Sequence, residues 1–200
     1  MERNHILNAF KSVMSKSNSN NFSVFAPIIE VDNELHLLFE VRSLELNHQP
    51  GEICFPGGKI EDNESPLQSA IRETIEELNI SKENIEIIAE LSPITTLFNV
   101  VIYPFCGFIN NTLLENIKYS TDEVGSIFTV PLRLLLEQNP LIHTLGVQLN
   151  ISEDFPHELI GNDYKWKTSN YPIYFYQYNN YIIWGLTARI VKELLDIIRK

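Results

Sequence analysis

The segment FPGGKIEDNESPLQSAIRETIEELNI, residues 55–80, joins a glycine turn to a helix with three closely spaced carboxylates. Ser65 is a typical N-cap, the proline after it fits the first helical position, and Gln68 completes a capping box with Ser65. Asn79 is a residue type that accepts the left-handed conformation in which many helices stop. The pattern therefore predicts a helix over residues 66–78.

One face of this predicted helix is apolar, and the opposite face is acidic. The stripe expected to face the core consists of Leu67, Ala70, Ile71, Thr74, Ile75 and Leu78. Glu73, Glu76 and Glu77 are expected on the polar side together with Arg72. Such carboxylates repel one another by roughly 0.2–0.5 kcal/mol per pair. A solvated helix face is the common explanation for a charge run.

The glycine turn ahead of the helix favours a second explanation, a cation site. Glycine lets the backbone approach a ligand closely. Hard cations such as Mg²⁺ take clusters of oxygen ligands and often retain substrate phosphates. A divalent ion would relieve the repulsion between the three carboxylates, so the segment predicts a metal site.

Composition narrows the class of protein. The 200 residues carry a formal net charge of -11, which argues against nucleic acid as the main ligand because that needs a basic surface. No apolar run reaches about 18 residues, so no membrane span is expected. Two cysteines, Cys54 and Cys106, exclude a disulfide scaffold and suit a reducing compartment. Without a signal peptide pattern, a cytoplasmic location is expected.

The remaining sequence alternates strand and helix patterns. Residues 1–21 are expected to form an N-terminal segment that consists of an amphipathic helix over residues 2–14 and a polar linker. Residues 22–200 are expected to form one domain. Helices are expected at 131–138 and 186–198. Strands are expected at 22–31, 35–42, 53–55, 85–91, 100–109, 124–130, 141–149, 171–178 and 181–184. These elements predict an α/β fold with one mixed sheet and helices on both faces.

The acidic segment resembles the Nudix box, G-x5-E-x7-R-E-U-x-E-E-x-G-U, in which U is bulky and apolar. Thr74 departs from an apolar position and Asn79 from a glycine position, and neither change removes a charged group. The box positions that match are Gly58, Glu64, Arg72, Glu73, Glu76 and Glu77.

This resemblance implies a Nudix fold, a mixed β-sheet between α-helices. It also implies metal-dependent hydrolysis of a nucleoside diphosphate linked to another group, with Mg²⁺ or Mn²⁺ as cofactor. Glu73 and Glu77 would be metal ligands, and Glu76 a further ligand or a partner through water. The carbonyl oxygen of Gly57 is a candidate for one more ligand.

The resemblance assigns the other charged residues supporting roles. Arg72 would orient the glutamates, and Glu64 would hold Arg72. The proton of the attacking water needs an acceptor, for which Glu76 and the loop residue Glu123 are candidates. Glu123 lies outside the box, and a solvated loop acid is its alternative explanation.

The flanks of the box resemble the coenzyme A diphosphatase branch of the family, whose pattern is close to LLTxRSxxLxxxxGxVxFPGG. The threonine of that pattern is not matched here. The positions that keep the register are Leu37, Leu38, Arg42, Ser43, Leu46, Gly51, Phe55, Pro56, Gly57 and Gly58. The resemblance implies cleavage of coenzyme A or its thioesters to 3′,5′-ADP and a 4′-phosphopantetheine product.

Substrate contacts are predicted less directly than the metal site. Arg42 is a candidate phosphate contact, with a surface ion pair as the alternative, and Gly58 and Lys59 are further candidates. Two other functions remain open, a Nudix hydrolase for ADP-ribose or a related dinucleotide, and an idle nucleotide-binding module. A homodimer is a possible state. Four aromatic residues are candidates for stacking an adenine, but a hydrophobic strand face or a dimer contact is the better explanation for them. These residues are Trp166, Tyr171, Tyr174 and Tyr176.

Overall fold

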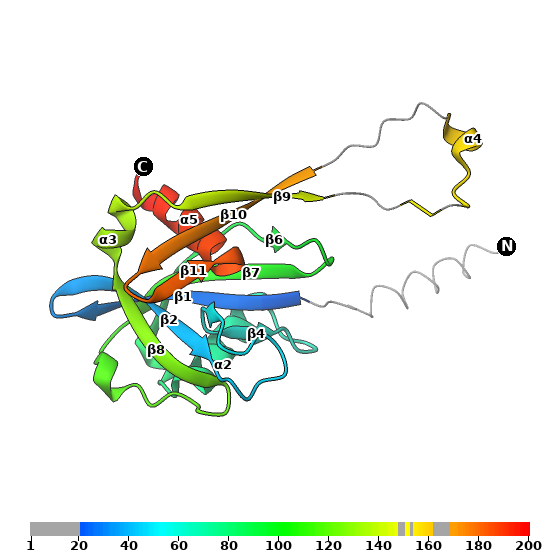
Figure 1. The fold of residues 1–200 in the computed structure, drawn as a ribbon. Coiled ribbons are helices and arrows are strands. Elements are labelled where there is room, and N and C mark those ends of the chain that lie inside the picture. Colours follow the sequence, from blue (N-terminus) through cyan, green and yellow to red (C-terminus); the bar gives the residue numbers. More distant parts are fainter. Residues whose placement is uncertain (1–20, 148–150, 153, 162–168) are drawn as a thin grey trace.

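The computed structural model describes residues 21–147, 151–152, 154–161 and 169–200 (Figure 1). The helix predicted over residues 2–14 therefore lies outside the described residues, as does the linker except for Asn21. That residue is the first of strand β1, so the body begins one residue earlier than predicted. None of the described helices is long and apolar enough to cross a membrane.

The larger sheet is mixed, as predicted. Its central order is β3-β2-β1-β7-β5, and β1 runs parallel to β7 while the other pairs are antiparallel. Three further strands pair with members of this order, β8 with β2, β4 with β1, and β6 with β7. The bounds are β1 (Asn21–Val31), β2 (Glu34–Arg42), β3 (Ile53–Cys54), β4 (Gly57–Lys59), β5 (Ile85–Glu90), β6 (Ile94–Thr95), β7 (Val101–Ile109) and β8 (Val124–Pro131).

The C-terminal strands form a separate antiparallel sheet, so the expectation of one sheet was wrong. Its order is β11-β10-β9, with β9 (Leu141–Val147), β10 (Ser169–Tyr178) and β11 (Tyr181–Trp184). Figure 1 shows β9 and β10 side by side, extending away from the larger sheet. The strand patterns were correct, but a local hairpin signal does not say which sheet a hairpin joins.

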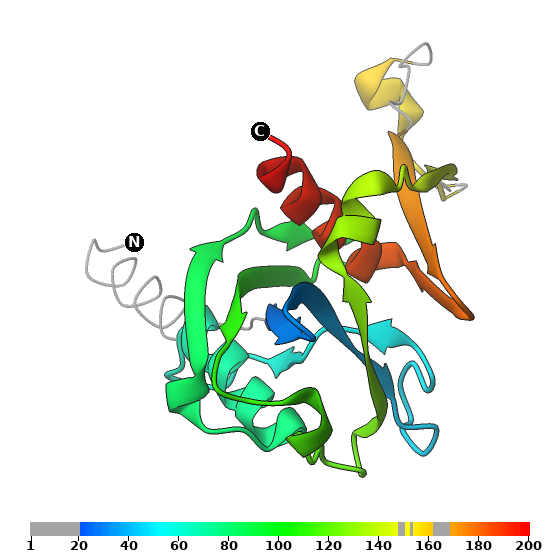
Figure 2. The ribbon, with the colours of Figure 1, turned by 90° about the vertical axis from the view of Figure 1, so that its left-hand side faces the viewer.

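Two helices cover the two faces of the larger sheet, and Figure 2 shows them on either side of β1. Helix α2 (Pro66–Leu78) packs over a core that includes Phe25 and Leu38. Helix α5 (Gly185–Ile198) packs over a second core that includes Leu37 and Phe39. Short helices lie at α3 (Leu132–Glu137), α4 (His157–Ile160), η1 (Lys82–Asn84) and η2 (Leu114–Asn116).

The segment that positions the site folds largely as its sequence predicts. Helix α2 has the predicted bounds, Ser65 and Gln68 form the capping box, and Asn79 stops the helix with φ 50°. The predicted turn at 56–58 is only partly correct. Gly57–Lys59 is strand β4, which pairs with β1 from Phe22 to Val24. The glycines thus belong to the sheet on which α2 lies.

Candidate active site

The two glycines of β4 bring the sheet backbone into contact with α2. The Gly57 N–H donates to Oε2 of Glu77 at 2.7 Å. Gly57 has φ 154°, and a Cβ there would lie 2.3 Å from the carbonyl oxygen of Ser23. A Cβ on Gly58 would lie 2.2 Å from Oε1 of Glu73. Glycine is therefore required at both positions for these carboxylates to lie against the strand.

The two glycines predict different consequences when each is replaced by alanine. Gly58→Ala should lower turnover with little change in melting temperature, because the new methyl group meets the flexible end of Glu73 and displaces its carboxylate. Gly57→Ala should mainly destabilise the fold, because its methyl group meets β1 backbone. Thermal unfolding and turnover of the two variants check this, and equal melting losses in both would contradict it.

Glu77 is buried, which corrects the expectation that it lies on the polar side of the helix, opposite the apolar stripe. The residue is 5% exposed and shares the inward face with Ala70 and Thr74. Burial raises the pKa of Glu77 to about 8, helped by the charges of Glu73 and Glu123, while the bond from Gly57 acts in the opposite direction. A carboxylate in this position needs a positive partner to remain ionised at neutral pH.

Arg72 holds the other box carboxylates in one network. Its Nε and Nη2 donate to the two carboxylate oxygens of Glu64, each at 3.0 Å. Its Nη1 lies 2.9 Å from Oε1 of Glu73 and 3.1 Å from Oε2 of Glu76. Nη2 also donates to the carbonyl oxygen of Lys59 at 3.3 Å. The predicted contact between Glu64 and Arg72 is thus present, as is contact between Arg72 and two glutamates.

The environments of these carboxylates differ. The hydrogen bonds from Arg72 lower the pKa of Glu64. Burial raises the pKa of Glu73 despite its contact with Arg72, and its side chain is only 15% exposed. Glu76 is 56% exposed. Glu73 and Glu77 therefore form the enclosed part of the site, and Glu76 lies at its open side.

Among the predicted residues outside helix α2, Arg42 and Glu123 affect the pKa of Glu77. Arg42 donates through Nε to the carbonyl oxygen of His48 at 3.4 Å, and its charge lowers the pKa of Glu77. Glu123 is exposed, its backbone carbonyl accepts from the Ser43 N–H, and its charge raises the pKa of Glu77. Both side chains thus act electrostatically on the site. Lys59 is exposed and contributes its backbone oxygen to Arg72.

The donor set suits a hard divalent ion, because it consists of carboxylate and backbone oxygens. Within the described ranges, no three His, Cys, Asp or Glu side chains form a ready-made metal cage. Glu73 instead contacts Arg72, and Glu77 contacts the Gly57 N–H. Glu73 and Glu77 are enclosed and have raised pKa values, and Arg72 is shared among three carboxylates. A divalent ion would supply the positive charge that both carboxylates need to ionise.

Sequence reasoning missed Glu40, a residue of β2. It is 1% exposed, and its pKa is raised well above the usual value by burial and by the charge of Glu77. The available signal was strand alternation, which places Glu40 on the same face as Leu38, beneath α2. Of the aromatic group, Trp166 lies outside the described residues, and Tyr176 is buried in the core under α5.

Comparison with known proteins decides the family. The sequence profile of the NUDIX domain matches residues 20–137, more than half of the chain. The chain belongs to the Nudix family. It is a Nudix hydrolase, a pyrophosphohydrolase that acts on nucleoside diphosphate derivatives. The resemblance found in the sequence is thereby confirmed.

Two relatives match nearly the whole chain of this Nudix hydrolase. Nudix hydrolase 3 from Caenorhabditis elegans is 29% identical over 196 residues, which cover 93% of this chain and 77% of the relative. The peroxisomal coenzyme A diphosphatase NUDT7 from Mus musculus is 28% identical over 198 residues, covering 94% and 78%.

A solved structure supports the fold. A MutT/nudix family protein from Enterococcus faecalis gives a TM-score of 0.52 at 16% identity, with 100% of this chain and 71% of that one covered. At this identity the likeness concerns the fold alone. The predicted α/β Nudix fold, a mixed sheet between helices, is confirmed.

Proposed function

We propose that this Nudix hydrolase cleaves the diphosphate of coenzyme A or its derivatives, giving 3′,5′-ADP and 4′-phosphopantetheine or its acyl form. The observation that carries the proposal is the flank ahead of the box, in which Arg42, Ser43 and Gly51 keep the register of the coenzyme A diphosphatase pattern. Further support is the similarity to the mouse coenzyme A diphosphatase.

The residues divide the work of binding and hydrolysis. Glu73 and Glu77 would hold Mg²⁺ or Mn²⁺, with Glu76 and the Gly57 carbonyl oxygen as further ligands. When bound, the ion neutralises phosphate oxygens and acidifies a water molecule. Arg72 keeps Glu73 and Glu76 in place, and it is itself fixed by Glu64.

Substrate orientation falls to residues around the box. Arg42 would contact phosphate, which a guanidinium can bind through two donors. Gly58 leaves room beside Glu73, and Lys59 is a further candidate contact. Glu76 and Glu123 are the candidate acceptors of the water proton: Glu76 belongs to the box and is exposed, and the charge of the exposed Glu123 acts on Glu77.

Substrate turnover tests the proposal. Incubated with Mg²⁺ and separately with coenzyme A, ADP-ribose or NADH, the protein should release 3′,5′-ADP from coenzyme A, measured by chromatography. Turnover of ADP-ribose or NADH alone would replace the proposal with the dinucleotide alternative. Binding without turnover of any of the three would indicate the idle module, although all four box glutamates and the arginine are present.

Location and assembly stay predictions. Cys54 and Cys106 are free thiols, which is compatible with the expected reducing, cytoplasmic compartment. A homodimer also stays a prediction, which size-exclusion chromatography with light scattering would check.

A further inference from the structure

The buried carboxylate of Glu40 has no structural partner that explains it. Glu40 is 1% exposed, and its Oε1 has no hydrogen-bond partner within the described part of the chain. Removing a carboxylate from water without pairing it costs several kcal/mol. A buried polar atom left unpaired in a folded protein therefore calls for an explanation, and a bound cation would provide one.

The position of Glu40 directs its side chain toward the box. Along β2 the side chains alternate: Leu37 and Phe39 lie in the core under α5, and Leu38 lies in the core under α2. Glu40 follows Leu38 by two residues and thus faces α2. Among the charges that act on Glu40, that of Glu77 is the strongest. Both carboxyl groups are therefore buried between the sheet and α2, close enough for their charges to interact.

The neighbouring cation does not neutralise Glu40. Arg42 lies two residues along the same strand and on the same face, and its charge lowers the pKa of Glu40. However, its Nε is directed to the carbonyl oxygen of His48, and in the residues described no ion pair joins Arg42 to Glu40. One free carboxylate oxygen thus remains in an enclosed and acidic place.

We propose that Glu40 is a further metal ligand, whose free oxygen binds a divalent cation together with Glu77. This inference rests on the proposed metal-dependent function, and it adds a carboxylate from the sheet to those that the helix supplies. An ion between β2 and α2 would offset both buried charges. Opposed ligands from two rigid elements also define its position better than carboxylates from a single helix turn do.

The donors beside Glu40 indicate the type of ion. The box carboxylates and the backbone of β4 supply oxygen atoms, and hard divalent ions such as Mg²⁺ or Mn²⁺ prefer oxygen ligands.

Mn²⁺ binding to the full chain tests the inference. Titration calorimetry with Mn²⁺ alone, supported by the Mn²⁺ electron paramagnetic resonance signal, should show affinity on the order of 10- to 100-fold weaker in Glu40→Gln than in the wild type. The melting temperature in EDTA should not fall, because the variant replaces a buried carboxyl group whose Oε1 has no hydrogen-bond partner among the described residues. Glu40→Leu, which removes the polar group altogether, decides the question if the glutamine variant does not fold.

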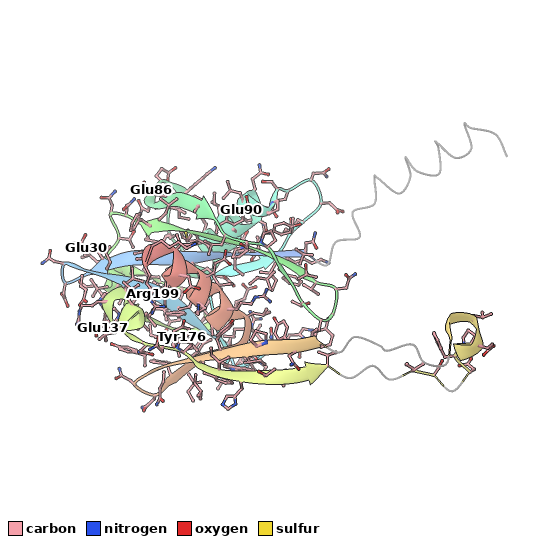
Figure 3. The ribbon with its side chains drawn as sticks, turned by 90° about the horizontal axis from the view of Figure 1, so that it is seen from above. Glu30, Glu86, Glu90, Glu137, Tyr176 and Arg199 are labelled. Carbon is pink, nitrogen blue, oxygen red and sulfur yellow. The ribbon has the colours of Figure 1, made fainter. Side chains whose placement is uncertain are left out.

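Glu30→Gln is the matched control, because Glu30 is an exposed glutamate near the β1–β2 turn (Figure 3). It should bind Mn²⁺ like the wild type. Wild-type Mn²⁺ affinity in Glu40→Gln or Glu40→Leu would overturn the inference, even if coenzyme A is hydrolysed. Weakened Mn²⁺ binding in a protein whose wild type leaves coenzyme A intact would support the inference and reject the proposed substrate. A wild type that binds no Mn²⁺ overturns both.

Discussion

Glu77→Gln should lower kcat for coenzyme A hydrolysis by about 10²–10³-fold or more, the range for loss of one preorganised electrostatic group. The variant loses the negative charge that faces the metal position. The fold should persist, because the glutamine amide oxygen can still accept from the Gly57 N–H, which now donates to Oε2 of Glu77. Steady-state kinetics at saturating Mg²⁺ and thermal unfolding measure the two effects.

The control for this variant is Glu90→Gln. Glu90 is an exposed residue at the end of β5, which is the last strand in the sheet order β3-β2-β1-β7-β5, and Figure 3 labels it together with Glu86. Its kcat should equal that of the wild type. Undiminished turnover in Glu77→Gln would remove Glu77 from the metal site, and loss of turnover together with loss of folding would leave Glu73→Gln as the deciding variant.

The burial of Glu77 marks the limit of sequence reasoning about the helix. Caps and periodicity predicted both ends of α2, because these depend on residues within the segment. Periodicity also assigned all three carboxylates to the polar side, opposite the apolar stripe, since a charge on a helix is normally exposed. The burial of Glu77 depends on β4, which presents the Gly57 N–H to it, and this contact joins residues 20 positions apart.

Glu40 was missed for a related reason. In the sequence it occupies a strand position where the coenzyme A diphosphatase pattern was not matched, and an isolated glutamate there looks like a solvent-facing residue. Glu40 is enclosed because α2 covers its face of the sheet. In addition, β2 pairs at this residue with β3 on one side and with β8 on the other. The box motif thus identified the carboxylates of the helix, whereas the placement of Glu40 beneath α2 depends on tertiary packing.

Without metal, the protein should become less stable as the pH rises from about 5 to 8. Glu77 has a pKa of about 8 in the folded state and an ordinary value of 4.5. Between these values the unfolded chain has lost a proton that the folded chain retains. The unfolded state then binds fewer protons, so the free energy of unfolding falls with rising pH. Below pH 4.5 both states are protonated, and this effect disappears.

The expected size is large enough to measure. A difference of about 3.5 pKa units for Glu77 corresponds to a loss on the order of a few kcal/mol in the free energy of unfolding between pH 5 and 8. For a chain of this length that is a melting temperature lower by on the order of 10 °C. Glu40 and Glu73 act in the same direction, because burial raises both of their pKa values. Glu64 acts oppositely but in a more acidic range, since its pKa is lowered.

Bound metal should reverse this trend, because a divalent ion binds the deprotonated carboxylates. Thermal unfolding from pH 5 to 8, in EDTA and in saturating Mn²⁺, should therefore show a stabilisation by metal that grows with pH. In Glu77→Gln the melting temperature in EDTA should depend less on pH. The rise in melting temperature on addition of Mn²⁺ should also be smaller than in the wild type. A melting temperature in EDTA that does not change over this range, or that changes equally in Glu77→Gln, would show that the buried carboxylates are not held protonated by the fold. The metal would then bind groups that are already ionised, and its stabilisation would be the same at every pH in the range.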